Sequence, residues 1–569
     1  MTGEIISAVP EQSKHYNHRT GRFIFFGGLL AVMLLRYFYY GLRYFPYMDD
    51  NNMYGTFSLI GGNPFTNIIQ AYHTYLTRPS VAFLDAYIIT PLWHTDAGRV
   101  AVLAMMVVLH FAAILMAYKL FSAAGIRLGA VFGLFFALVP LGAEATYWAA
   151  ASSRIVVGLF FAVLAVYMLY LAARHIRRTG RFPVVWYALY FVIGLISTGF
   201  YEQAAAFYFA LAVIFLTLYR RKLAGLKRRK PAGLALFWAA PFVNIGLVAL
   251  YYLKVSNVTA SGSRGSLTLA GVASNFRIFK IFWQDSTSSL RDYIYYGASY
   301  ALRELSTPWG VACIALVAAF AGVLIWLRAR ERRERSRGFF YTRVAELLAG
   351  LLLIAAGLAP FLVLQNFYVY ARNIFIPTFG LALVIDAVIA MLSDKRGIVS
   401  SIACALILVV FFATDVSQLY DFKAISQSDD LVASQVADDL RPVIESGVRP
   451  DLILFGAERK LVPTSTFWFY SAPGAAWSMM GKLNVELGSI DKVGVTAVAN
   501  NGTLTAASVD APGENTVLLG IGLDLTVRML AFDPSTNSLV YTDSGGNAVT
   551  YGTLALSGDG RAYTFKISK

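Results

Sequence analysis

The chain has 569 residues, of which 57% are hydrophobic and 14% are charged, and its formal net charge is +15. Soluble globular domains average about 45–50% apolar and about 25% charged residues, so this composition excludes an ordinary soluble protein. The charge distribution also argues against nucleic-acid binding. Residues 421–569 hold 11 Lys/Arg and 16 Asp/Glu, whereas most cations of the first 420 residues lie in short clusters between apolar runs. That arrangement is typical of a membrane protein.

Eleven apolar runs approach the length of about 20 residues that a membrane-spanning helix needs. They lie near 22–42, 99–119, 127–143, 153–173, 184–200, 203–219, 232–253, 308–327, 344–364, 374–391 and 397–415. No small-residue cleavage site follows the first run, because Arg43, Tyr44 and Phe45 stand there. We therefore interpret it as an uncleaved first helix.

Basic clusters predict the orientation of these helices. The segments 220–230 and 328–337 are both rich in Lys and Arg, and both are cytoplasmic if the N-terminal segment 1–21 is cytoplasmic. The opposite orientation would translocate both clusters, against the positive-inside rule. We expect a protein integral to the cell (cytoplasmic) membrane, with a transmembrane domain over 22–419 and outer loops at 43–98 and 254–307.

The first outer loop contains a further apolar stretch, Val81–Trp93. It is too short to span comfortably, and counting it as a span would invert every later loop. We predict a helix that lies in the membrane interface or dips into it.

The composition changes at the end of the last apolar run, and residues 420–569 are predicted to form an extracytoplasmic soluble domain. Residues 428–447 have the pattern of an amphipathic helix, and 451–456 that of a short buried strand. From 492 to 569, short alternating runs are separated by turn signals such as Asn501-Gly502 and Asp559-Gly560. Six or seven such strands predict a compact antiparallel sandwich.

The sequence gives little support for disulfides or metal binding. The two cysteines, Cys313 and Cys404, both lie inside apolar runs. His73 and His94 are the only histidines predicted to be external, and neither has a ligand partner at helical spacing. We therefore predict no metal-binding residue.

Charged residues close to the bilayer are costly, and they are candidates for function by default. The predicted topology places seven such residues on the outer side. They are Asp49, Asp50, Arg78, Glu144, Arg154, Glu202 and Arg372. Carboxylates and arginines on one face would suit a site for an anionic lipid-linked substrate together with a general base.

Each of these residues also has a structural interpretation. Asp49 and Asp50 would cap a helix equally well, and the arginines would reach lipid headgroups by snorkelling. Glu144 and Glu202 would form structural ion pairs with the arginines. The set as a whole is more informative than any of its members.

These residues occur in an order that resembles the GT-C glycosyltransferases, in particular the tetratricopeptide-linked O-mannosyltransferases and their bacterial relatives. In that family an acidic pair follows the first helix, as Asp49-Asp50 do, and an Arg-Pro comes next, as Arg78-Pro79 do. The further matches are Pro140, Glu144, Ala145 and Arg154, then Glu202, then Arg372 with Pro377. Tyr201 replaces the lysine of a Lys-Glu motif, Ala371 replaces the acid of a Glu-Arg motif, and the tyrosine of the Tyr-x-Pro motif that follows is lost.

The resemblance covers roughly residues 20–415 and implies transfer of a sugar from a polyprenyl-phosphate donor on the outer face. It implies Asp49 as the base and Asp50 as the residue that positions the acceptor or an optional divalent cation. Arg372 would bind the leaving phosphate, helped by Arg78 and Arg154. Glu144 and Glu202 would orient these arginines or bind sugar hydroxyls. The acceptor would be a glycan, a lipid or a protein.

Two outer segments are candidate partners of this site. The loop 254–307 is rich in aromatic residues and basic at Arg264, Arg277 and Lys280, so it would cover the donor or lie in the interface as an amphipathic segment. The aromatic residues of 467–479 would stack on sugar rings or pack in a core.

Three other functions remain open from the sequence. A transporter or flippase of lipid-linked sugar would use the same arginines, but no inverted repeat with matching broken helices is apparent. An oligosaccharide polymerase or ligase would use a pyrophosphate-linked donor. A scaffold whose tail binds a partner is the third.

Overall fold

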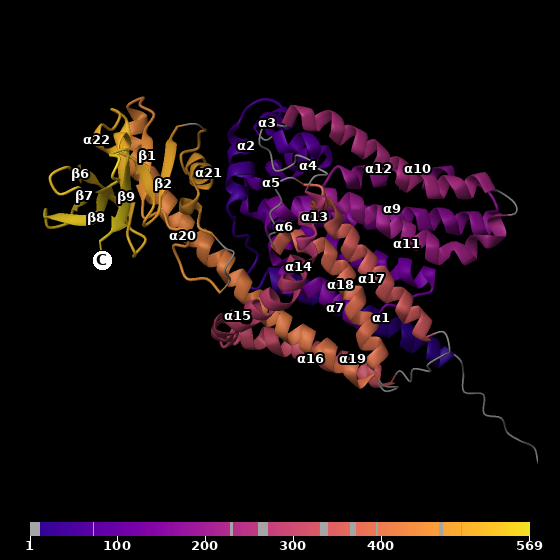
Figure 1. Ribbon diagram of the computed structural model, residues 1–569. Coiled ribbons are helices and arrows are strands. Elements are labelled where there is room, and N and C mark those ends of the chain that lie inside the picture. Colours follow the sequence, from indigo (N-terminus) through magenta and orange to yellow (C-terminus); the bar gives the residue numbers. More distant parts are fainter. Residues whose placement is uncertain are drawn as a thin grey trace, which may run out of the picture.

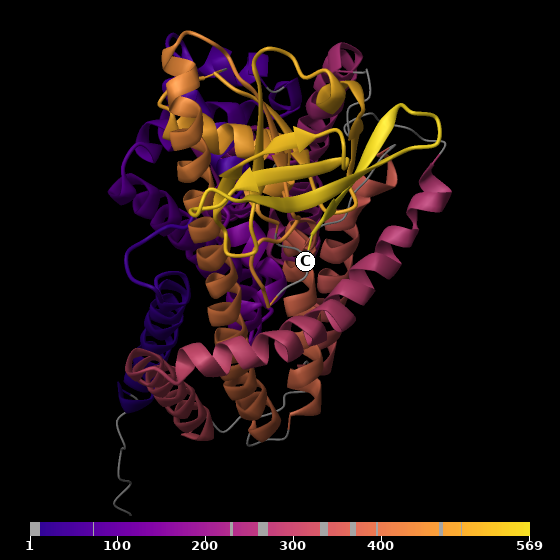
Figure 2. The same cartoon turned by 90° about the vertical axis from the view of Figure 1, so that its left-hand side faces the viewer.

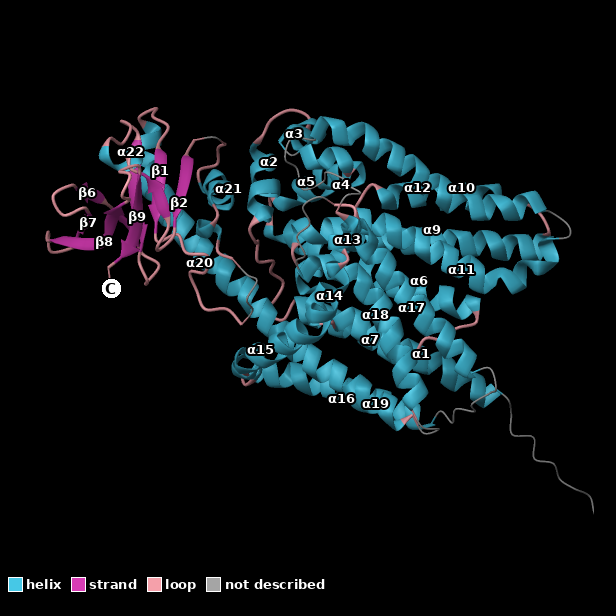
Figure 3. Cartoon of the chain, in the orientation of Figure 1, coloured by secondary structure: helices cyan, strands magenta, loops and turns pink. Residues whose placement is uncertain are grey.

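The computed structural model describes residues 12–71, 73–227, 231–259, 271–330, 339–364, 371–393, 397–465, 470–490 and 492–568. These residues form a bundle of long helices with a smaller domain of strands and helices at one end (Figures 1 and 3). The N-terminal end of helix α1 lies at the opposite end of the bundle (Figure 1).

Nine helical segments of the described residues are long and apolar enough to cross a membrane. They are α1 (Gln12–Tyr37), α6 (Asp96–Ala124), α9 (Ala149–Thr179), α11 (Glu202–Lys227), α12 (Pro231–Thr259), α16 (Pro308–Arg330), α17 (Phe339–Leu362), α18 (Ala371–Leu392) and the run α19 (Ile398–Leu406), η6 (Ile407–Phe411) and α20 (Phe412–Glu445). The other two predicted spans are helical but shorter, α7 (Ala130–Leu138) and α10 (Val184–Thr198). The chain is a polytopic membrane protein.

Buried charges join helices that are distant in the sequence. Arg36 of α1 forms an ion pair with Asp415 of α20 at 2.9 Å, and both side chains are almost fully buried. At the start of α17, Arg343 contacts Glu346 and also Asp386 of α18. Sequence analysis singled out none of these residues, although a charge inside an apolar run is itself a signal.

The first outer loop is a chain of short helical segments between α1 and α6. They are η1 (Asn51–Gly55), α2 (Thr56–Leu59), α3 (Pro64–Ala71), η2 (His73–Thr77), α4 (Pro79–Leu84), η3 (Asp85–Ile89) and α5 (Thr90–Trp93). The stretch Val81–Trp93 is helical throughout. Two further short segments, η4 (Pro140–Gly142) and α8 (Ala143–Thr146), join α7 to α9.

The second outer loop also contains helices. They are α13 (Val272–Asn275), α14 (Arg277–Gln284), η5 (Asp285–Ser289) and α15 (Leu290–Leu305). Seen from the C-terminal domain, this run crosses the end of the bundle (Figure 2). It exposes large apolar side chains, among them Trp283, Tyr295 and Tyr296, as an interfacial amphipathic helix does. Arg264 lies outside the described residues.

The C-terminal domain contains two sheets. One has the order β2-β1-β4-β5 and the other β3-β9-β8-β7-β6. The strands are β1 (Asp451–Phe455), β2 (Gly494–Val498), β3 (Thr503–Thr505), β4 (Thr516–Ile521), β5 (Val527–Met529), β6 (Ala531–Asp533), β7 (Ser538–Thr542), β8 (Ala548–Leu556) and β9 (Ala562–Ile567). The helical elements of this domain are η7 (Ala472–Gly474), α21 (Ala476–Glu486) and α22 (Ala507–Asp510).

The prediction of a wholly antiparallel sandwich is wrong for the first sheet. Strand β1 pairs in parallel with both β2 and β4, and only β5 is antiparallel to its neighbour. The physical reason is that β1 is buried on both faces. Leu452 and Leu454 pack against α20 and α21, whereas Ile453 and Phe455 pack against the second sheet. Parallel strands need long connections, and α21 supplies the one between β1 and β2.

The C-terminal domain is tied directly to the membrane helices. The predicted helix 428–447 is the second half of α20, which runs without a break from the last membrane span. The backbone of α21 touches the first outer loop, because a Cβ atom on Gly481 would lie 2.6 Å from the Asn52 Cα atom. The domain therefore rests on the segment that follows the acidic pair Asp49-Asp50.

Candidate functional site

The chain after α1 folds back over the start of α9, and Asp50 holds it there. Its carboxylate accepts hydrogen bonds from the Tyr44 hydroxyl at 2.5 Å, the Tyr47 amide at 3.0 Å and the Ala150 amide at 2.9 Å. The Ala150 bond satisfies an amide in the first turn of α9, as a cap does. Asp50 is fully buried, and burial raises its pKa to about 7. These contacts give Asp50 a structural role.

Asp49 is held differently from Asp50. It is only partly buried, and its charge acts on Arg372. The residue before it, Met48, has a φ of +36°, a backbone conformation that is uncommon for residues other than glycine. Such strain persists only where surrounding contacts hold it, and the bonds of Asp50 are those contacts. The strained turn therefore fixes the direction in which Asp49 is presented.

Arg372, at the start of α18, is paired with Glu144 of α8. Its Nη1 atom donates to Glu144 Oε1 at 2.7 Å, and its backbone amide donates to Glu144 Oε2 at 3.2 Å. The guanidinium also lies 4.8 Å from the centre of the Trp148 ring. The Trp148 indole donates in turn to the Tyr47 carbonyl at 3.1 Å. The pair is thus attached to the turn that carries Asp49.

Arg78 and Glu202 form a second pair, with two parallel hydrogen bonds. Arg78 donates from Nε at 3.1 Å and from Nη2 at 3.0 Å to the two oxygens of Glu202. The Tyr252 hydroxyl donates to the same carboxylate at 2.8 Å. The Arg78 guanidinium lies 4.7 Å from the centre of the Tyr201 ring. Because one edge of the guanidinium is engaged with Glu202, only its other donors remain for a phosphate.

Tyr201 connects the two pairs. Its ring contacts Arg78, and its hydroxyl accepts a hydrogen bond from the side-chain amide of Asn373 at 2.6 Å. Asn373 is the neighbour of Arg372 in the chain. The charges of Arg78, Arg372 and Arg154 all act on the Tyr201 hydroxyl. The structure therefore brings Arg78 into contact with Tyr201 and Arg372 next to its hydrogen-bond partner Asn373, with the charge of Arg154 in range.

Arg154 faces a buried network of tyrosine hydroxyls and the carboxylate of Asp85. Its Nη2 atom donates to the Tyr75 hydroxyl at 3.3 Å. Tyr75 donates to Asp85 at 2.5 Å, and Tyr54 donates to the other oxygen of Asp85 at 3.2 Å. Asp85 is fully buried, and burial raises its pKa to about 6. The charge of Arg154 partly offsets this rise of the pKa.

A small cavity of about 20 Å³ lies beside the Arg372–Glu144 pair. It is lined by residues of the first outer loop, of η4, α8 and α18, and of α15 and α20, including Tyr47, Glu144, Tyr293 and Gln418. This volume holds about one water molecule.

Asp50 is poorly placed to bind a divalent cation. The two oxygens of Asp50 already accept three hydrogen bonds. Among the described residues, no three His, Cys, Asp or Glu side chains are grouped as metal ligands. His94 is exposed, and the side chain of His73 lies outside the described part of the chain.

Asp85, Tyr201 and Asn373 belong to this site but were not predicted from the sequence. Asp85 carried a signal, since it is the single acid of the apolar stretch Val81–Trp93. Tyr201 was noted only as a replacement within a motif. Nothing in the sequence around Asn373 indicates that its amide reaches Tyr201.

Comparisons with known proteins give little further information. No family model matches the chain, and no curated protein matches it. Among solved structures, the crystal structure of ArnT from Cupriavidus metallidurans in the apo state is similar over 81% of this chain and 84% of that chain. The sequence identity is 14% and the TM-score is 0.30.

Proposed function

We propose that this protein is a membrane glycosyltransferase of the GT-C type. It transfers a sugar from a polyprenyl-phosphate donor to a glycan, lipid or protein acceptor on the extracytoplasmic face of the membrane. The observation that carries the proposal is the convergence of Asp49, the Arg372–Glu144 pair and the Arg78–Glu202 pair at one end of the bundle. The order of these residues in the sequence, which resembles that family, supports it further.

The orientation rests on the distribution of charge along α9. The first residues of α9 lie beside the turn that carries Asp49, whereas its last turn contains Arg177 and Arg178. A helix of 31 residues is about 46 Å long, so these cations lie at the other end of the bundle. Basic residues at that end favour a cytoplasmic location for it. The site and the C-terminal domain then face outward.

The proposed reaction is a displacement at the anomeric carbon of the sugar. Asp49 takes the proton of the acceptor hydroxyl, and the hydroxyl oxygen forms a bond to that carbon. The bond from the carbon to the phosphate oxygen breaks, and polyprenyl phosphate leaves with the bonding electrons. Arg372 stabilises the negative charge that develops on the phosphate, since a guanidinium can bind two of its oxygens.

The two carboxylates paired with arginines have a positioning role in this reaction. Glu144 accepts hydrogen bonds from the side chain and from the backbone amide of Arg372 and so holds the guanidinium in place. Little reorganisation is therefore needed when negative charge develops on the phosphate. Glu202 does the same for Arg78. We assign Arg154 to the support of Tyr75 and Asp85 and only indirectly to the phosphate.

Transfer of radiolabelled sugar tests the proposal. Purified protein in lipid nanodiscs is incubated with a panel of polyprenyl-phosphate sugars and a crude membrane glycan fraction. Wild type is compared with Asp49→Asn and with Asp96→Asn as a matched control. Asp96 is an exposed acid at the start of α6, where it pairs with Arg99. We expect donor-dependent incorporation that Asp49→Asn removes and Asp96→Asn retains.

Two results would contradict the proposal. Equal incorporation by wild type and Asp49→Asn would exclude Asp49 as the base. Absence of incorporation with every donor, together with movement of lipid-linked sugar across vesicles, would identify a transporter. Pyrophosphate-linked donors are included in the panel, so that a polymerase or ligase would also be recognised.

A further inference from the structure

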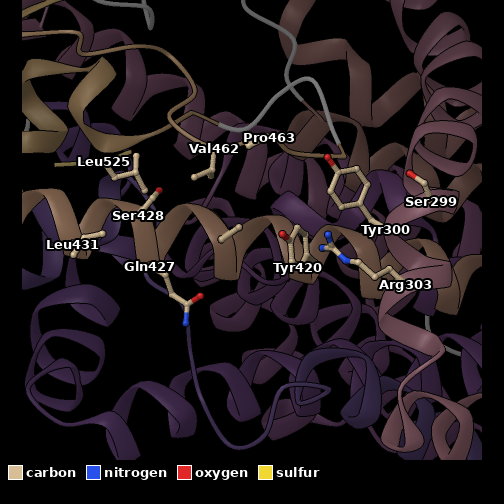
Figure 4. A pocket seen from close by; sticks show the side chains of 11 residues that line it. Ser299, Tyr300, Arg303, Tyr420, Gln427, Ser428, Leu431, Val462, Pro463 and Leu525 are labelled. Atoms are coloured by element: carbon tan, nitrogen blue, oxygen red, sulfur yellow. The ribbon is translucent and has the colours of Figure 1, made fainter. Parts of the chain in front are cut away.

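A cavity lies between the membrane helices and the C-terminal domain. Its volume is about 660 Å³, within the range of about 300–1,000 Å³ that is usual for ligand pockets. Four separate parts of the chain line it, namely α15, α20 and two loops of the C-terminal domain (Figure 4). We call this space the junction pocket. None of the residues assigned to the transferase site lines it.

The membrane side of the junction pocket carries a cation between two aromatic rings. The guanidinium of Arg303 lies 4.6 Å from the centre of the Tyr420 ring and 5.4 Å from that of Tyr300. The Arg303 side chain is 56% exposed, and its Nε atom is 3.4 Å from Glu304. The Glu304 carboxylate also accepts a hydrogen bond from Tyr40 at 2.8 Å. A guanidinium has five N–H donors, so the Glu304 contact leaves donors to reach a ligand.

Away from Arg303, the lining is mostly aliphatic, with Gln427 and Ser428 of α20 as its polar members. This aliphatic wall includes Leu431 of α20 and Val462, Pro463 and Leu525 of the C-terminal domain (Figure 4). Leu525 has a φ of +63°, a left-handed conformation that is unusual for a residue of this size. Strain of this kind clusters at binding sites. The left-handed backbone places the Leu525 side chain against the pocket, although glycine would adopt this conformation with less strain.

The distribution of these groups selects the class of ligand. A phospholipid in its normal orientation would place its anionic head on the C-terminal side and its chains towards the membrane. Here the cation is on the membrane side and the aliphatic wall is on the outer side, so the order is reversed. A sugar ring with one acidic substituent fits better. Its C–H face packs on tyrosine or aliphatic side chains, and its acid pairs with a guanidinium.

The junction pocket is connected to the transferase site through the crossing of α15 and α20. The two helices touch where a Cβ atom on Gly297 would lie 2.6 Å from Ser417 Oγ. On one side of this crossing, Tyr293 lines the small cavity beside Glu144. On the other side, Tyr300 lines the junction pocket. Seven residues of helix separate the two tyrosines, which corresponds to about 10 Å.

We propose that the junction pocket binds an acidic sugar unit of the acceptor, with its acid on Arg303 and its ring against the tyrosines and the aliphatic wall. The separation of about 10 Å means that this unit is not the one that reacts. The acceptor then contains at least two sugar units, one anchored here and another at Asp49. The assignment to an acceptor rests on the proposed transferase function, whereas binding of an acidic sugar does not.

Binding to the full-length protein in phosphatidylcholine nanodiscs tests the proposal, by saturation-transfer NMR titration. The probes are glucose 1-phosphate, glucuronic acid, neutral methyl glucoside and inorganic phosphate. The variants are Arg303→Ala and Leu431→Trp, which fills the pocket and keeps the cation. The matched control is Arg291→Ala, because Arg291 is an exposed arginine of the same helix and does not line the pocket.

We expect both acidic sugars to bind at least ten-fold more weakly to Arg303→Ala and Leu431→Trp, with Arg291→Ala unchanged. Methyl glucoside should bind at least ten-fold more weakly than glucose 1-phosphate to wild type. Equal binding of acidic sugars to wild type and both pocket variants would overturn the proposal. So would inorganic phosphate binding as tightly as glucose 1-phosphate, or phosphatidylglycerol in the nanodisc displacing the sugars through Arg303.

The same variants separate this proposal from the transferase function. If Arg303-dependent binding is found and no transfer occurs with any donor, the pocket proposal is supported and the transferase proposal fails. If transfer occurs and acidic sugars bind Arg303→Ala as they bind wild type, only the pocket proposal fails.

Discussion

The hydroxyl of Tyr201 accepts a hydrogen bond of 2.6 Å from Asn373, and this bond joins two arginine–carboxylate pairs. Tyr201 contacts Arg78 through its ring, and Asn373 is adjacent to Arg372. The start of α11 and the start of α18 are therefore fixed relative to each other at the point where their charges converge. Tyr201 is neutral at this position, so it joins the two pairs without adding a charge.

Removing this hydroxyl tests the connection. In Tyr201→Phe the ring remains over Arg78, but Asn373 loses its acceptor. One hydrogen bond contributes about 1 kcal/mol, so we expect sugar transfer to fall roughly five-fold. In a double-mutant cycle with Glu144→Gln, the effects should not be additive, because both changes release Arg372. Additive effects in kcat would show that Tyr201 acts independently of the Arg372–Glu144 pair.

Substitution of Asp49 should lower activity, whereas substitution of Asp50 should lower stability. Asp49→Asn removes the proposed base, and we expect transfer to fall by about 10²–10⁴-fold with an unchanged melting temperature. Asp50→Asn replaces one acceptor oxygen by a donor among the hydrogen bonds that hold the turn, at a cost of about 1–3 kcal/mol. A lower melting temperature is expected for this variant. Differential scanning fluorimetry and the transfer assay, run in parallel, decide between the two roles.

Stability should fall as the pH rises from about 4 to about 7. Burial raises the pKa of Asp50 to about 7 and that of Asp85 to about 6. Between the unfolded pKa of about 4 and these values, the folded protein binds more protons than the unfolded chain. The free energy of unfolding therefore decreases with pH, by at most about 1.4 kcal/mol per unit for each group.

Two variants check the assignment of this pH dependence. Asp50→Asn does not titrate and should flatten the decrease in melting temperature between pH 5 and 7. Asp533→Asn is the control, since hydrogen bonds from Ser535 and Thr536 lower the pKa of Asp533, whose effect lies at more acidic pH. If the melting temperature of Asp50→Asn decreases with the same slope as that of wild type, other groups cause the pH dependence.

Replacing only one partner of the Arg36–Asp415 ion pair should destabilise the protein. Asp415→Asn leaves a buried guanidinium without its counter-charge, and we expect a loss of about 3–5 kcal/mol, seen as a lower melting temperature. The double variant Arg36→Met/Asp415→Leu removes both charges and should recover most of that loss. If the double variant is less stable than either single variant, the charges themselves are needed to position α1 against α20.

At Gly481 the backbone of the C-terminal domain comes close to that of the first outer loop. A methyl group there would lie 2.6 Å from the Asn52 Cα atom and 2.7 Å from the Asn52 backbone nitrogen. Gly481→Ala should push α21 away from η1 and reduce transfer, because Asn52 follows the acidic pair by two residues. Gly558→Ala is the control, with no atom within 4 Å of its added carbon. Equal activity of both variants would show that this contact does not support the site.

The sequence by itself determined the membrane class, the helical spans and the change of composition near residue 420. These are set by local apolar runs and by charge clusters, both of which can be identified without knowing which helices touch. The same local patterns indicated the strands of the C-terminal domain. They did not indicate the parallel pairing of β1, because alternation along one strand does not identify its neighbours.

Only the tertiary structure decided which charged residues face one another. Glu144 pairs with Arg372 across 228 residues, and Arg78 pairs with Glu202 across 124. It also separated the roles of Asp49 and Asp50, which are equivalent in the sequence but differ in burial and in hydrogen-bond partners. The physical reason is that burial and distance are properties of packed helices, whereas the sequence records only the identity of each side chain.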